Sequence, residues 1–164
     1  MRSLIILLAS VALALPAAAQ KFGHIDSQQL LLSMPEREQA QTKLESQAVM
    51  YEEQMKAMQT ELQTKYDDYL AKSETWPAAI RTTKEKELNQ LQQGMQDFSA
   101  TAQQDLAKME EELLTPMIER AKKAIEDVGT ENGFTYIFDA STGVTLFNGG
   151  EDVTSLVKAK LGLQ

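Results

Sequence analysis

The side chains best suited to acid–base or metal chemistry are three carboxylates near the C-terminus and one histidine, namely Asp139, Glu151, Asp152 and His24. A pair of carboxylates can act as general acid and base or can hold a cation. These acids also stand at a turn and before a short helix, positions where carboxylates ordinarily accept backbone N–H groups. This second interpretation is the stronger one. It predicts a protein that is not an enzyme, with no catalytic residue and no metal site.

Other kinds of chemistry are excluded by composition. The chain has no cysteine, which rules out a disulfide, a thiol nucleophile and a cysteine metal site, and its single histidine cannot form a histidine metal site alone. The glycine segment "LFNGGEDVT" lacks the lysine of a phosphate-binding loop, so no nucleotide and no cofactor is expected. A net charge of −8 disfavours nucleic acid as a partner. Contact with a membrane stays open.

The first nineteen residues have the pattern of a signal peptide. Arg2 precedes an apolar run from Leu4 to Leu15, and Ala17-x-Ala19 is followed by Gln20. Twelve apolar residues are too few to cross a bilayer core, which needs about 20. We therefore expect residues 1–19 to be removed before Gln20 and the rest of the chain to be exported.

The central residues have helical composition, with apolar side chains repeating at steps of about 3.6 residues in two stretches. Side chains equidistant from Thr75 match in size, as with Leu44 and Leu106, which favours an antiparallel hairpin over residues 36–115. Tyr51 with Phe98 fits the same register within one residue. The predicted seam between the two helices consists of Leu44, Ala48, Tyr51, Met55, Met58, Leu62, Leu88, Leu91, Met95, Phe98, Ala102 and Leu106. The stripe continues to Tyr66 and Tyr69.

The turn of this hairpin is predicted at "SETWPAA", residues 73–79, where the only tryptophan stands beside a proline. Trp76 either closes the tip by packing on Tyr69 and Ile80 or contacts a partner. At the other end, Pro35 and Pro116 are predicted hinges, because proline lacks the N–H that a helix interior needs. We expect a bend at Pro116, with the helix continuing beyond it.

The remaining residues, 20–35 and 116–164, form the predicted body of an α+β fold. Strands are expected at "KFGHI", "FTYIFD" and "VTLF", with short helices at "SQQLLL", where Asp26 is a plausible cap, and between Asp152 and Gly162. About 60 residues cannot bury so many aromatic side chains within one chain. Pairing with further copies would complete the sheet and cover its edges, so we expect an obligate oligomer.

The segments "KFGHIDSQQLLLSMPE" and "GFTYIFDASTGVTLFNGGEDVTSLVKAKLG", with the long hairpin between them, resemble the Skp/OmpH family of periplasmic chaperones. The resemblance covers residues 21–162, and the C-terminal block is its most specific part. It implies a homotrimer whose β body carries three helical arms that hold unfolded outer-membrane proteins without ATP. It implies that the trimer body is built by Phe22, Ile25, Phe134, Tyr136, Phe138, Val144 and Leu146.

This chain is acidic, whereas the best-known member of that family is basic. We therefore assign no lipopolysaccharide site to this chain from the resemblance. Client contacts are expected instead from apolar side chains on the arm and its tip, the candidates being Val49, Met50, Trp76 and Ile80. An alternative is a structural or adaptor protein of the cell envelope, with the hairpin as a spacer that docks one fixed partner through Trp76.

Overall fold

The computed structural model describes residues 20–163; the expected signal peptide lies outside them. The elements in chain order are β1 (Phe22–Ile25), α2 (Ser27–Leu32), α3 (Pro35–Lys72), α4 (Ala78–Glu131), β2 (Tyr136–Asp139), β3 (Glu151–Asp152) and α5 (Thr154–Leu161). The chain divides into two compact units. One is the hairpin unit, Leu31–Ala121, and the other is the strand unit, which comprises the described residues up to Leu30 and those from Lys122 onward.

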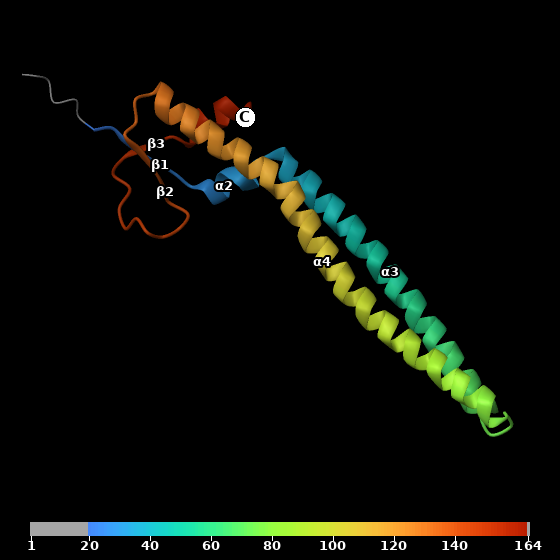
Figure 1. Cartoon of the computed structure of the whole chain (residues 1–164). Helices are drawn as coiled ribbons and strands as arrows, with labels where there is room; N and C mark the ends of the chain where they lie inside the picture. The colour runs from blue at the N-terminus through green and yellow to red at the C-terminus, as the bar shows by residue number, and fades with distance from the viewer. Residues whose placement is uncertain (1–19, 164) are drawn as a thin grey trace, which may run out of the picture. The chain divides into compact units, whose positions relative to one another are not determined.

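In the hairpin unit, α3 and α4 run side by side and are joined by a short turn (Figure 1). The predicted register is visible in one aromatic pair, since the rings of Tyr51 and Phe98 meet edge to face with centroids 5.8 Å apart. The Tyr51 hydroxyl also lies 3.2 Å from Oδ2 of Asp105 across the same interface. These contacts between the two helices confirm the predicted helical hairpin.

Local chemistry sets the ends of the two helices. Pro35 occupies the first position of α3. A backbone N–H at this position would have no acceptor within the helix, so the proline costs no hydrogen bond. The Ser73 N–H closes α3 by donating to the Tyr69 carbonyl over 2.8 Å. Pro77 ends the turn, and its carbonyl accepts the Ile80 N–H over 3.0 Å as the first turn of α4 forms. The turn thus falls within residues 73–77, inside the predicted tip.

Pro116 lies inside α4, which continues past it to Glu131. The predicted continuation of this helix beyond the proline is therefore correct. A proline at this position removes one backbone hydrogen bond and crowds the carbonyl four residues earlier, which weakens the helix locally. The role of Pro116 as a hinge stays a prediction.

The strand unit is built on a three-stranded parallel sheet in the order β2-β1-β3. Phe22 to Ile25 pair with Tyr136 to Asp139, and Gly23 and His24 pair with Glu151 and Asp152. The first predicted strand is confirmed, whereas the second begins two residues later than expected. The strand predicted at residues 144–147 is wrong, because this segment forms no ladder with the sheet. Both edges of β1 are already occupied, which leaves that segment no partner on the central strand.

The core of the strand unit combines side chains from β1, α2, α5 and the last turns of α4. Ile25, Leu30, Val153 and Val157 are at most 2% exposed, and Ala124 and Val128 are also buried. Gly23 allows close packing on the central strand, because a Cβ there would lie 3.0 Å from both the Phe134 ring and a Val153 methyl. Most of this core consists of small or medium side chains, so the large aromatic residues remain outside it.

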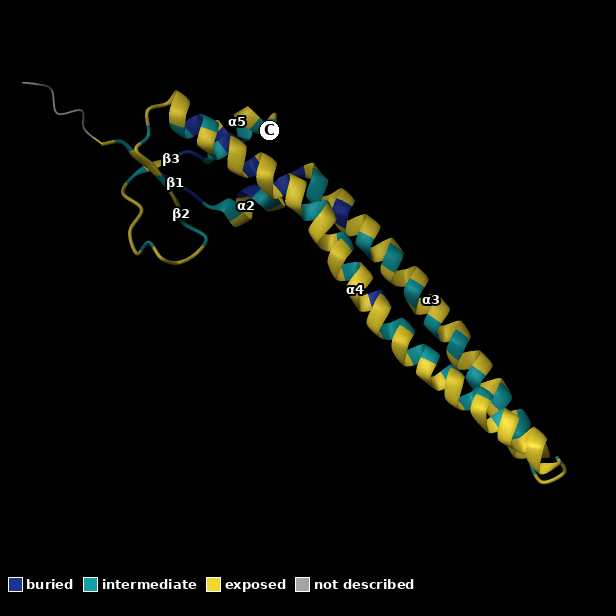
Figure 2. Ribbon diagram, in the orientation of Figure 1, coloured by how far each residue is buried: buried dark blue, intermediate teal, exposed yellow. Residues whose placement is uncertain are grey.

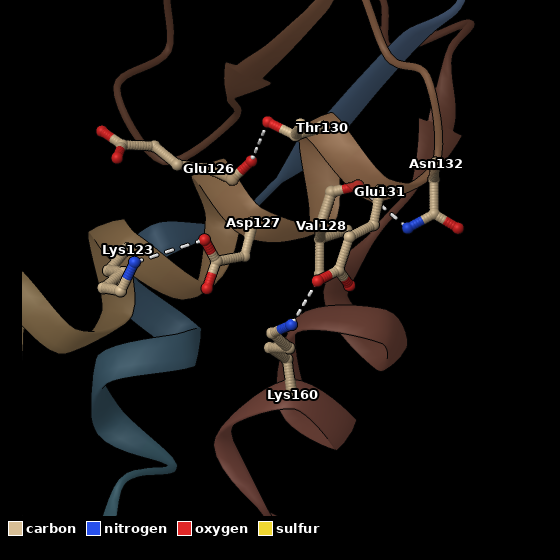
Figure 3. A network of polar contacts seen from close by, with 8 residues as sticks. All are labelled: Lys123, Glu126, Asp127, Val128, Thr130, Glu131, Asn132 and Lys160. Atoms are coloured by element: carbon tan, nitrogen blue, oxygen red, sulfur yellow. Dashed lines mark hydrogen bonds and ion pairs between the residues drawn. The ribbon is translucent and has the colours of Figure 1, made fainter.

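Polar contacts fix the end of α4 and connect it to α5 (Figure 3). Lys160 of α5 lies 2.5 Å from Oε1 of Glu131, and this hydrogen bond raises the pKa of the lysine. The Asn132 side chain donates to the Val128 carbonyl over 2.9 Å, and Gly133 follows with φ +67. Glycine adopts this left-handed conformation without a steric cost. The turn at Gly133 then lets the chain leave α4 toward β2.

Candidate functional site

The three C-terminal carboxylates do not form one acidic site. β2 and β3 flank β1 on opposite sides, so Asp139 is separated from Glu151 and Asp152 by the central strand. Glu151 pairs with Lys21 at 2.9 Å, and both side chains remain substantially exposed to water. Within residues 20–163 no three His, Asp or Glu side chains gather closely enough to hold a metal ion.

Asp139 is a structural carboxylate at the end of β2. Its two oxygens accept the backbone N–H and hydroxyl of Ser27 at 3.2 and 2.6 Å, and the N–H and hydroxyl of Ser141 at 2.9 and 2.7 Å. Burial of the carboxylate opposes ionisation, but these hydrogen bonds outweigh it and hold the pKa of Asp139 below its ordinary value. The residue thus joins the first turn of α2 to the end of β2.

Asp152 has a comparable local role at the start of α5. Its Oδ1 accepts the Thr154 N–H over 2.8 Å, and the hydrogen bonds from Thr154 lower the pKa of the carboxyl group. At the other short helix, Oδ1 of Asp26 accepts the Gln29 N–H over 2.9 Å, which confirms the predicted cap. The acids therefore stabilise turns and helix starts.

The sheet instead exposes a large aromatic surface. Side chains alternate between the faces of a strand, so Phe22 and His24 of β1 lie on one face with their register partners Tyr136 and Phe138 of β2. The rings of Phe22, Tyr136 and Phe138 lie with centroids 6.0–6.3 Å apart. All three aromatic residues are 40–60% exposed. We call these four residues the aromatic face.

The segment after β2 adds to this apolar surface. Val144 is 81% exposed, Leu146 is 100% exposed and Phe147 is 87% exposed. Among the expected body residues, Ile25 is instead buried in the core of its own chain, and Phe134 is partly covered by Lys21 at 3.9 Å from its ring centroid. An apolar surface this extensive ordinarily marks a contact with another molecule.

The hairpin half-buries one stripe on each helix and exposes the rest, as the teal and yellow bands in Figure 2 show. Ala102 is the one predicted seam residue that is fully buried, whereas Ala48 is exposed and the other ten are half-buried. Three of the four proposed contact residues, Val49, Met50 and Ile80, are 45–59% exposed. A helix pair without further layers cannot cover its seam on both sides, which explains the incomplete burial.

Two further apolar side chains of the arm, Tyr66 and Leu70, are exposed. Tyr66 was expected to continue the buried stripe but is 48% exposed, and Leu70, one turn later, is 59% exposed. Tyr66 borders a groove of about 730 Å³ between α3 and α4, which is lined by Gln59, Leu62, Gln63, Tyr66, Tyr69, Glu85, Leu88, Asn89 and Gln92. Leu70 lies four positions after Tyr66, a spacing that places both side chains on one side of a helix.

At the tip of the hairpin, Trp76 packs within its own chain. Its ring meets the Tyr69 ring at an angle of 64°, with the centroids 6.1 Å apart. The Tyr69 hydroxyl in turn donates to Oε1 of Glu85 over 2.5 Å, and this hydrogen bond raises the pKa of the tyrosine. The tip is thus held together by an aromatic pair and a hydrogen bond between α3 and α4.

Comparison with known proteins gives a consistent result across the whole hairpin and strand unit. Residues 21–161 match the family model described as outer membrane protein (OmpH-like). The chain is 26% identical to the chaperone protein Skp of Yersinia enterocolitica over 154 residues, which cover 90% of this chain and 92% of that protein. It is 24% identical to the chaperone protein Skp of Photorhabdus laumondii subsp. laumondii over 141 residues, covering 86% of each chain.

A solved structure has the same fold. The crystal structure described as an OmpH-like outer membrane chaperone from Caulobacter crescentus CB15 superposes with a TM-score of 0.75 and 17% sequence identity. The match covers 88% of this chain and 85% of the other. In the part of the chain that the structure describes, no helix is both long and apolar enough to cross a membrane.

Proposed function

The chain belongs to the OmpH-like family, and on that premise we propose that it is a periplasmic holdase chaperone that binds unfolded outer-membrane proteins without ATP. The observation that carries the proposal is the hairpin with apolar side chains exposed along its length. α3 has 38 residues, so the arm is about 57 Å long at 1.5 Å per residue. Val49 and Met50 lie far along the arm from Leu70 and Ile80, and all four are exposed.

Distributed contacts suit a protein that must bind many sequences. Each exposed methionine, leucine or tyrosine side chain contributes little, but several act together when one long client touches the arm at several points. Methionine is flexible and polarisable, so it adapts to apolar groups of different shape. Binding of this kind needs no catalytic residue and no cofactor, which agrees with the structural roles of the acids described above.

The aromatic face supports self-association as the second part of the proposal. Phe22, Tyr136 and Phe138 would lose most of their contact with water if another copy covered them, and Val144 and Leu146 would extend the covered surface. We propose a homotrimer, the number that the resemblance implies. Arms from several copies would then enclose a client together, which one arm cannot do.

The experiment that tests this function is native mass spectrometry of residues 20–164 mixed with an unfolded outer-membrane barrel protein, without nucleotide. We expect three copies of the chain with one client, and we expect no complex with the same barrel protein in its folded state. A stable oligomer that does not bind the unfolded client would contradict the holdase function and favour an adaptor with one fixed partner.

Replacement of Trp76 by alanine distinguishes the holdase from the adaptor. In a holdase the substitution removes the aromatic pair with Tyr69 and frays the tip, so client affinity should fall by no more than about threefold, since one contact among many is lost. In an adaptor whose anchor is Trp76, binding would disappear. Fluorescence titration with labelled client measures the change, and Glu74→Ala, at an exposed polar residue of the same turn, provides the control.

Clients of different size require arms that move, and we propose Pro35 and Pro116 as the hinge positions. Pro35 begins α3, and Pro116 interrupts the hydrogen bonding of α4 within the same hairpin unit. Amide hydrogen exchange should therefore be about tenfold or more faster in the turn around residue 116 than at the centre of α4. Equally slow exchange along the whole helix would contradict this hinge.

A further inference from the structure

The hairpin is held together at two separate levels by contacts between α3 and α4. Toward the root, the rings of Tyr51 and Phe98 meet with centroids 5.8 Å apart, and Ala102 is buried one turn later. Toward the tip, the Tyr69 hydroxyl donates to Oε1 of Glu85 across the two helices over 2.5 Å. Each of these two parts can therefore keep its own shape while the stretch between them deforms.

The stretch between the two levels is loosely packed. No residue from 55 to 66 in α3 or from 85 to 95 in α4 is buried. Besides the groove of about 730 Å³ described above, a second groove of about 300 Å³ borders this stretch, lined by Met58, Glu61, Lys65, Glu87, Gln90, Leu91 and Gly94. Well-filled interiors resist deformation, and this part of the arm lacks that filling.

Gly94 lies inside α4 at the root end of this loosely packed stretch. Glycine is among the weakest helix formers, because its backbone has the most conformational freedom to lose. Close packing does not require a glycine here, since a Cβ would meet only the terminal methyl of Met58 at 3.9 Å, an ordinary van der Waals contact. The glycine therefore makes α4 easier to bend without serving the packing of the hairpin.

The facing part of α3 is weakened in a different way. The Thr60 hydroxyl donates to the Lys56 carbonyl over 2.9 Å, and the Thr64 hydroxyl donates to the Thr60 carbonyl over 2.8 Å. A hydroxyl that bonds to the carbonyl one turn earlier competes with the backbone hydrogen bonds and often bends a helix. Met58, which lies nearest to Gly94, directly precedes these two turns, so both helices are weakened at the same level of the arm.

We propose that the arm bends at the level of Gly94, Thr60 and Thr64, so that its distal part moves as one unit relative to the root. The moving part of α4, from Ala78 to Gly94, is about 24 Å long at 1.5 Å per residue. This bend is separate from the hinge proposed at Pro116. Its use in client capture rests on the holdase function proposed above, because arms that bend near their ends fit clients of different size.

Amide hydrogen exchange of residues 20–164 without client tests the bend. We expect exchange over residues 90–98 to be about tenfold faster than over residues 102–110 on the root side and over residues 82–88 on the tip side. Exchange that instead becomes steadily faster toward the tip would show ordinary fraying of the hairpin end and would overturn the inference.

Gly94→Ala isolates the backbone effect, because the added methyl group fits beside Met58. It should slow exchange over residues 90–98 by about fivefold, the difference in helix preference between alanine and glycine. Ala107→Gly in the Gly94→Ala background is the matched control, since it returns a glycine to an exposed position of α4 in the packed part of the arm. Residues 90–98 should remain slow in this double variant, and a return to fast exchange would contradict a bend at Gly94.

Distances between two spin labels show whether the arm bends. The chain has no cysteine, so labels attached through Thr82→Cys and Gln104→Cys, both at exposed positions of α4, are unique. Dilution with unlabelled chains restricts the measurement to distances within one chain. A straight helix separates these positions by about 33 Å. We expect a broad distribution that extends to shorter distances and that narrows toward this value in Gly94→Ala; a single narrow distance without that substitution would overturn the inference and leave the holdase intact.

Affinities for a small and a large unfolded outer-membrane barrel protein connect the bend to client capture. The ratio of the two affinities should change by about threefold or more in Gly94→Ala, since stiffer arms fit a narrower range of sizes. An unchanged ratio would overturn the role of the bend in capture. Failure of the unsubstituted chain to bind either client would overturn the holdase function, while the exchange and distance measurements would still decide whether the arm bends.

Discussion

Replacing Gly150 by alanine should destabilise the strand unit by about 1–3 kcal/mol, the usual cost of forcing an extra group into a packed site. A Cβ at this position would lie 2.7 Å from the Phe22 carbonyl oxygen and 3.0 Å from its carbonyl carbon. These are backbone atoms of the central strand, so they cannot rotate away as a side chain would. β3 begins at the next residue, Glu151, and would have to separate from β1.

The free energy of unfolding from urea titrations, followed by circular dichroism, measures this loss. Gly149→Ala is the matched control, because the Cβ there would lie 2.5 Å from a ring carbon of Phe147. That ring is 87% exposed and can rotate into water, so the control should change stability by less than about 0.5 kcal/mol. Equal losses in the two variants would contradict the assignment of Gly150 to a backbone contact.

Replacing Asp139 by alanine should cost about 2 kcal/mol, because it leaves four donors of Ser27 and Ser141 without their acceptor. The site is only partly buried, which keeps the expected loss below the sum for four fully buried bonds. Urea titration at pH 7 measures the effect. Asp97→Asn is a suitable control, since the Asp97 carboxylate accepts one exposed hydrogen bond from Gln93 on the same helix.

The contribution of Asp139 should also depend on pH in a definite direction. Its folded-state pKa lies below the ordinary value of 3.8, so the stabilisation is complete above that value and is lost as the pH falls through the lower folded pKa. The difference in unfolding free energy between the wild type and Asp139→Asn should therefore be constant from pH 7 to about pH 5 and shrink below about pH 4. A difference that grows on acidification would refute the assignment.

The hairpin could be predicted from sequence because its contacts repeat. Each helix presents an apolar residue every three or four positions, and the proline and tryptophan at the turn fix where the two helices meet. Distances from Thr75 that match to within one residue then predicted the aromatic contact between Tyr51 and Phe98 that the structure contains. The exposure of Tyr66 could not be predicted in this way, since it depends on the groove between the two helices near the tip.

The strand unit was harder to predict because its order is set by contacts between distant segments. Alternation identified the strand Phe22–Ile25 and all of Tyr136–Asp139 with two residues too many at its start, but it also predicted a strand at residues 144–147 that does not form. A strand needs a neighbour to pair with, and this segment pairs with neither of the free outer edges of the sheet, which belong to β2 and β3. The two-residue strand Glu151–Asp152 is too short to show any alternation.

The sequence by itself determined the family, the helical hairpin with its turn, and the surplus of aromatic residues over what one small sheet can bury. These features depend on local periodicity and composition, which can be determined from the sequence alone. Only the tertiary structure decided that Asp139 ties α2 to β2, that Gly150 approaches the Phe22 backbone, and that the aromatic rings of β1 and β2 gather on one exposed face. These depend on segments more than 100 residues apart in the chain, whose meeting is set by the parallel register of the strands.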